Sequence, residues 1–140
     1  MSTPQLDEEL AELRPALVAW RRHLHRHPEL SFEERETAEF VARTLGSFGD
    51  LEVSRPTPTS VHGRLRGGRP GRVVALRADM DGLPIQEENA VDVASRRPGV
   101  MHACGHDAHM AMLLGTARLL TRGREQLPGE VRFLFSTPRS

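Results

Sequence analysis

The chain has 140 residues, enough for a single domain with a moderate hydrophobic core. Its 19 Lys and Arg residues balance 19 Asp and Glu residues, so we expect no nucleic-acid or membrane partner. The single cysteine excludes an internal disulfide, and no apolar run reaches the roughly 18 residues of a membrane span. The first ten residues are polar and acidic, unlike a secretory signal. We therefore expect a cytoplasmic protein.

The first third of the chain predicts two amphipathic helices. Leucines and a tryptophan recur every three or four residues over 6–24, and we expect this helix to end at Pro28. Ser31 and Glu34 have the spacing of a capping box, which predicts that a second helix begins there. Its apolar face follows over residues 40–48.

The rest of the chain predicts strands and one more helix. Residues 61–65 alternate weakly, as in a strand, and the continuous apolar run 73–76 is typical of a buried strand. Asp107 is placed to cap a third helix that carries apolar residues to Leu120, and residues 131–135 form another buried-type strand. This order predicts an α/β fold, with a mostly parallel or mixed sheet flanked by helices.

Candidate metal ligands concentrate in residues 101–110, which read Met-His-Ala-Cys-Gly-His-Asp-Ala-His-Met. An extended backbone would point His102, Cys104 and His106 the same way, and imidazole with thiolate suits a borderline-soft metal such as zinc. The alternative is a small buried thiol beside a surface imidazole. His109 is either a further ligand or a helix-surface histidine, and His102 either contacts a ligand group or is solvated.

Two aspartates follow the apolar run 73–76. Asp79 and Asp81 would lie at the carboxyl end of the sheet, where α/β proteins collect ligands. There they would bind a metal directly or orient a ligand histidine. The alternative is turn chemistry alone, because Asp-Gly-Leu-Pro is a good turn sequence.

A second group of histidines lies near the end of the first predicted helix. His23, His25 and His27 would complement the helix dipole there. Residues two apart on a helix face apart, so we interpret this group as structural.

Four segments resemble a family of metal-dependent amidohydrolases, which includes hippurate hydrolase, N-acyl-amino-acid aminoacylases and the plant auxin-conjugate hydrolases. They stand in family order and are residues 21–34, 74–88, 99–120 and 127–135. The resemblance implies the N-terminal part of a layered, zinc-peptidase-like catalytic domain. Family members are often oligomeric and carry a lid or dimerisation domain. We expect residues 1–140 to be a truncated part that lacks both this domain and the C-terminal half.

The resemblance also implies roles for individual residues. Cys104 and His106 match metal ligands, with Cys104 bridging two divalent ions, zinc or manganese. Asp81 matches an aspartate that supports a metal ligand. The metals would activate water and polarise the scissile carbonyl, while a glutamate moves the proton. The implied activity is hydrolysis of the amide bond of small N-acyl amino acids such as hippurate.

The sequence departs from the family after residues 131–135. The family there reads approximately Gln-Pro-Ala-Glu-Glu, whose glutamates are the general base and a metal ligand. Residues 136–140 read Ser-Thr-Pro-Arg-Ser, so the general-base glutamate is absent. The alternative function is therefore an inactive remnant that at most binds metal weakly, and its 131–135 strand would form an open sheet edge. An unrelated binding module is disfavoured by the four ordered segments.

Overall fold

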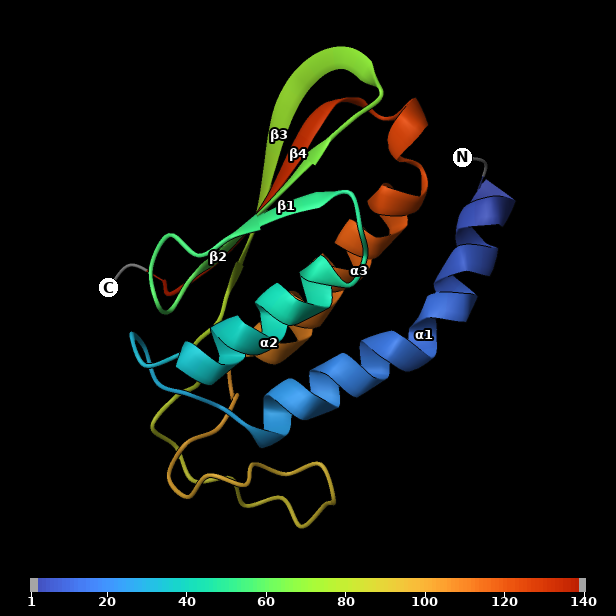
Figure 1. The fold of residues 1–140 in the computed structure, drawn as a ribbon. Coiled ribbons are helices and arrows are strands. Elements are labelled where there is room, and N and C mark those ends of the chain that lie inside the picture. Colours follow the sequence, from blue (N-terminus) through green and yellow to red (C-terminus); the bar gives the residue numbers. More distant parts are fainter. Residues whose placement is uncertain (1–2, 139–140) are drawn as a thin grey trace.

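The computed structural model describes residues 3–138, which form one sheet with three helices on one of its faces (Figure 1). Helices α2 and α3 lie against the sheet, and α1 packs on the outside of α3. The elements in chain order are α1 (Thr3–Arg26), α2 (Arg35–Gly46), β1 (Leu51–Ser54), β2 (Val61–Arg66), β3 (Arg69–Asp79), α3 (His106–Arg122), a 3-10 turn (Arg124–Gln126) and β4 (Pro128–Ser136).

The sheet is mixed, with the strand order β1-β2-β4-β3. Strand β2 pairs antiparallel with both β1 and β4, whereas β3 pairs parallel with β4. Helix α3 makes the crossover between the two parallel strands, so its first turn starts near the end where β3 stops. The predicted α/β class with a mixed sheet flanked by helices is confirmed.

Two predictions about strand burial are wrong. The apolar run in β3 is not buried, because β3 is an edge strand: Val73 is 57% exposed and Val74 is 51% exposed. Conversely, β4 lies inside the sheet between β2 and β3, with Phe133 and Phe135 fully buried. The open apolar edge therefore belongs to β3 and not to residues 131–135.

The capping box predicted for α2 is also absent. Glu34 makes no side-chain cap, and the Ser31 hydroxyl instead donates to Asp81 at 2.7 Å. The cap comes from Glu29, whose buried carboxylate accepts from the backbone amide and the hydroxyl of Thr37, each at 2.6 Å. A carboxylate at a helix N-terminus also complements the helix dipole.

The hydrophobic core lies between the sheet and the two inner helices. Each of its large side chains contributes about 1.5–3 kcal/mol by leaving water, and together they hold the end of β3 and β4 against α3. The largest fully buried members are Leu24 from α1, Leu45 from α2, Met110 and Leu114 from α3, Leu65 from β2, Phe133 and Phe135 from β4, and Met80 just after β3.

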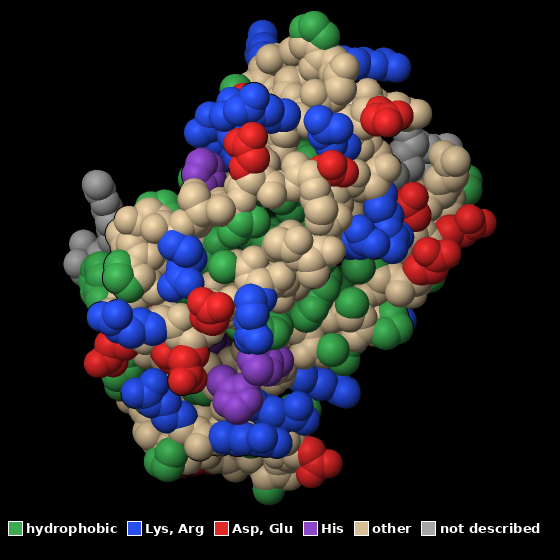
Figure 2. Space-filling view, in the orientation of Figure 1, with side chains coloured by type: hydrophobic (Ala, Val, Ile, Leu, Met, Phe, Trp, Pro, Cys, Tyr) green, Lys and Arg blue, Asp and Glu red, His purple; other side chains and the backbone are tan. Residues whose placement is uncertain are grey.

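Surface charge is evenly mixed. Figure 2 shows acidic and basic side chains interspersed over one face of the molecule, as the balanced composition suggests. No helix in residues 3–138 is both long and apolar enough to cross a membrane.

Candidate metal site at the carboxyl end of the sheet

The candidate site forms where parallel strands β3 and β4 end. Asp79 is the last residue of β3, Asp81 follows it closely, and His106 opens α3. His106 Nδ1 lies 2.8 Å from Asp81 Oδ1 and 3.0 Å from the Asp81 carbonyl oxygen. Because Nδ1 faces only oxygen acceptors, it carries the ring proton in the neutral tautomer. Nε2 then presents a free lone pair.

The two aspartates have different surroundings. Asp81 is buried, and its second oxygen accepts the hydrogen bond from Ser31, so both of its carboxylate oxygens are engaged. Asp79 pairs with Arg77 through Oδ1 at 3.1 Å, while its Oδ2 faces His106 Nε2 at 3.8 Å. Asp81 is therefore placed to orient His106, and Asp79 lies on the side where a ligand of Nε2 would sit.

Cys104 and His102 do not share one environment. Cys104 is exposed, so the reading as a buried thiol is wrong. His102 is only 4% exposed, so it is not solvated either. The extended backbone expected over His102, Cys104 and His106 does not continue to His106, because the chain turns through Gly105 at φ +97°. The first residue after this bend is His106.

His102 is a buried imidazole without hydrogen-bond partners in the described part of the chain, at either ring nitrogen. Burial lowers the pKa of His102 to about 4, and the nearby His25 and His106 act in the same direction. The ring is therefore neutral at physiological pH. His109 is exposed, and its ring centroid is 6.0 Å from that of His106, as expected for a helix-surface histidine.

Glu34 is a site residue that the sequence analysis interpreted only as part of a cap. Its side chain is fully buried; Oε2 accepts from the Thr137 hydroxyl, and Oε1 has no partner among residues 3–138. Burial raises the pKa of Glu34, and the negative charge of Asp81 adds to the effect. A buried carboxyl with a raised pKa beside a candidate site is a feature of functional sites. No local sequence signal distinguishes it from a capping residue.

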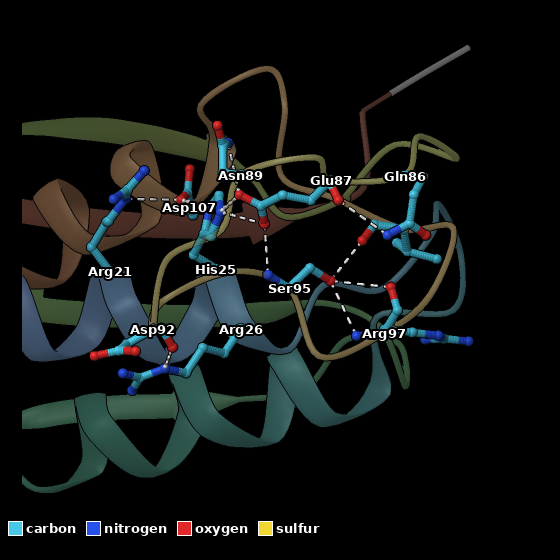
Figure 3. Close-up of polar contacts among 11 residues, drawn as sticks. Arg21, His25, Arg26, Gln86, Glu87, Asn89, Asp92, Ser95, Arg97 and Asp107 are labelled. Atoms are coloured by element: carbon cyan, nitrogen blue, oxygen red, sulfur yellow. Dashed lines mark hydrogen bonds and ion pairs between the residues drawn. The ribbon is translucent and has the colours of Figure 1, made fainter.

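A second polar cluster lies beside the site (Figure 3). Asp107 does not cap α3, because the N-cap residue is Gly105. Its carboxylate instead binds His25 Nδ1 at 2.8 Å and Arg21 Nε at 2.9 Å. Among the other predicted structural histidines, His23 stacks on Phe40 of α2, with ring centroids 4.2 Å apart.

The donor types fit a divalent metal, although the set is small. Within residues 3–138, no three His, Cys, Asp or Glu side chains are arranged to hold a metal ion. The available donors are His106 Nε2, the exposed Cys104 thiol and the Asp79 carboxylate. These suit a borderline-soft divalent cation in kind, but zinc sites usually use three or four protein ligands. The described residues thus supply suitable donor types without forming a complete metal site.

Known proteins resemble this chain in sequence and fold. Residues 75–137 match the family described as Peptidase family M20/M25/M40. The chain is 61% identical over 135 residues to the N-acyl-L-amino acid amidohydrolase of Geobacillus stearothermophilus, covering 96% of this chain and 36% of that protein. It is 46% identical over 128 residues to the N-acetyl-L-cysteine deacetylase of Bacillus subtilis, covering 90% of this chain and 30% of that protein.

A solved structure agrees with these sequences. The YxeP protein of Bacillus subtilis, described as a dinuclear metal binding peptidase from the M20 family, superposes with a TM-score of 0.84 at 44% identity, covering 89% of this chain and 35% of that one. The chain thus spans about a third of the length of the relatives it matches. The resemblance read from the sequence is confirmed: this chain is related to amidohydrolases and to metal-binding peptidases of the M20 family.

Proposed function

We propose that this chain forms the N-terminal part of the catalytic domain of a divalent-metal amidohydrolase that cleaves N-acyl amino acids. The observation that carries the proposal is the pair formed by His106 and Asp81, which leaves Nε2 of the histidine free at the carboxyl end of the sheet. The 61% identity to an N-acyl-L-amino acid amidohydrolase supports the substrate class. The dinuclear metal-binding relative supports the use of divalent metal, for which we propose zinc or manganese.

Each residue of the site has a task in this proposal. Cys104 and His106 would hold the metal, and Asp81 would keep the proton on Nδ1 and fix the orientation of the imidazole ring. When bound, the metal would activate a water molecule and polarise the amide carbonyl. Glu34, whose pKa is raised by burial, is the carboxyl of this chain best suited to hold a proton near the site.

A chimera tests the proposal. Residues 1–135 of this chain are joined to the part of the Geobacillus stearothermophilus relative that the chain does not cover, and release of amine from hippurate and N-acetyl amino acids is measured with zinc or manganese. We expect turnover that Cys104→Ala abolishes and that the helix-surface substitution Thr116→Ala leaves intact. A chimera that folds, binds metal and hydrolyses none of these substrates would contradict the proposal.

A second candidate function follows from the small donor set: residues 1–140 alone bind metal without hydrolysing amides. The chain assayed by itself should then release no amine. Turnover on the order of 1–10³ per second, abolished by Cys104→Ala, would refute this second function. In that case Asp79, Asp81 and Glu34 are the carboxylates to substitute next.

A further inference from the structure

A buried charge cluster joins α1, the loop after β3 and the first turn of α3 (Figure 3). His25 is its centre: Nδ1 lies 2.8 Å from Asp107 Oδ2, and Nε2 lies 3.1 Å and 3.2 Å from the two carboxylate oxygens of Glu87. The side chains of His25, Glu87 and Asp107 are 6%, 3% and 1% exposed. Arg21 reaches the same Asp107 oxygen from the surface, at 2.9 Å.

The geometry sets the protonation of His25. A neutral imidazole has one N–H, so its other nitrogen would turn a lone pair toward a carboxylate oxygen. Glu87 does not supply the missing proton. Burial acts to raise its pKa, but hydrogen bonds from Asn89, the Ser95 amide and His25 outweigh burial and lower the pKa to about 2. Both ring nitrogens of His25 thus face carboxylate oxygens, an arrangement in which an imidazolium, with its two N–H groups, would satisfy both partners.

The cluster balances its own charge. The imidazole of His25 and the guanidinium of Arg21 face the carboxylates of Glu87 and Asp107, so with an imidazolium at His25 two positive charges would meet two negative ones. A buried charge pair that loses one partner leaves the other uncompensated, which is strongly destabilising. Removing the charge of one member of the cluster should therefore destabilise the segments that the cluster joins.

One side of the cluster holds the loop. Glu87 accepts from the Ser95 amide at 2.6 Å and from the Asn89 side chain at 3.0 Å, so the loop folds around its carboxylate. Ser95 in turn donates to the Val100 carbonyl at 2.7 Å. These bonds lead directly to residues 101–104, which carry the candidate ligand Cys104.

The other side of the cluster holds α3. Asp107 lies in the first turn of the helix, next to His106, and its bond to His25 fixes the rotation of that turn against α1. Residues 101–107 are thus anchored to α1 through His25 from both directions.

We propose that His25 is a positioning residue, held as an imidazolium between Glu87 and Asp107, that fixes the segment 101–107. The proposal deepens the proposed function and rests on it for the identity of Cys104 and His106 as ligands. The anchoring of the segment 101–107 by His25 does not depend on whether Cys104 and His106 are metal ligands.

The protonation of His25 is tested in the wild-type chain by nitrogen-15 NMR of labelled histidine near neutral pH. We expect both His25 ring nitrogens to carry a proton. A ring with one N–H would overturn the proposal, and this measurement needs no variant that might fail to fold.

The anchoring is tested by two matched variants, Glu87→Gln and Glu130→Gln. Like Glu87, Glu130 is a carboxylate whose pKa is lowered to about 2, here mainly by the hydrogen bond from Arg64 at 2.7 Å, but it lies on β4 and has no bond to His25 or Asp107. Amide hydrogen exchange should accelerate on the order of 10²-fold in residues 85–107 of Glu87→Gln only. Equal exchange of these residues in the two variants would overturn the anchoring role.

Metal binding separates this inference from the proposed function. We expect zinc affinity to fall about tenfold in Glu87→Gln and in Asp107→Asn, and not in Glu130→Gln. If the wild type and Cys104→Ser bind zinc with equal affinity, the proposed function is refuted. Hydrogen exchange would still decide whether His25 anchors the segment 101–107. The role of His25 alone would be overturned by a different result. In that result, Cys104→Ser weakens zinc binding, but Glu87→Gln and Asp107→Asn leave it unchanged.

Discussion

Gly105 is a residue at which an added methyl group should disturb the candidate site without clashing with any neighbouring atom. It has φ +97° at the N-terminus of α3, and a Cβ added there would meet no heavy atom within 4 Å. Gly105→Ala therefore adds backbone strain without a steric clash. An L-residue in the left-handed region costs roughly 1–2 kcal/mol. For a chain of this size the loss corresponds to a fall in Tm of about 3–8 °C.

Gly49→Ala is the matched control. Gly49 has φ +76°, and its added Cβ also meets nothing within 4 Å, but it follows α2 and lies far along the chain from Cys104 and His106. Calorimetry should give similar losses in Tm for the two variants. Zinc affinity, measured by competition with a chelating dye, should fall only in Gly105→Ala. An equal effect of both substitutions on zinc affinity would refute the reasoning, as would a Gly105→Ala chain with unchanged Tm.

Three other substitutions test the fold and its charges. Gly129→Ala would place Cβ against the Arg72 carbonyl oxygen at φ +72°, so the free energy of unfolding should fall by on the order of 4 kcal/mol or more. A urea unfolding midpoint equal to that of the wild type would contradict this. Burial raises the pKa of Glu34, so its favourable contribution is complete below the ordinary carboxyl pKa and is lost as pH rises through its own pKa. Glu34→Gln should therefore gain stability relative to wild type as the pH rises above the ordinary carboxyl pKa of 4.5, whereas a stability difference that stays constant with pH would exclude the effect. Val74→Lys on the exposed edge of β3 should reduce self-association in sedimentation velocity while changing the free energy of unfolding by less than about 0.5 kcal/mol; unchanged association would show that this edge is not the contact.

Local patterns predicted the elements well, because helix and strand periodicity depends on neighbouring residues. The helix over residues 6–24 and the strands over 61–65 and 131–135 are present. Burial of the strands was less predictable, because it depends on the strand order. The run 73–76 reads as a buried strand, yet the order β1-β2-β4-β3 puts it at the edge. Strand β1, with only four residues, gave no clear pattern.

The candidate site shows the same division. The meeting of Asp81 and His106 was predictable, since both follow from the rule that ligands gather at the carboxyl ends of parallel strands. The pairing of His25 with Asp107 was not, because these residues are 82 positions apart and each has a plausible local role in a helix end. Ser31 likewise fits a capping box, but its hydroxyl is engaged by Asp81.

We infer that Cys104 and His106 bind a divalent metal at the end of β3. The most direct measurement is the zinc affinity of the chain of residues 1–140, by chelator competition, for the wild type, Cys104→Ser, His106→Ala and the helix-surface control His109→Ala. We expect Cys104→Ser and His106→Ala each to weaken zinc binding by about tenfold or more, while His109→Ala leaves it unchanged. Equal zinc affinity of the wild type, Cys104→Ser and His106→Ala would contradict it.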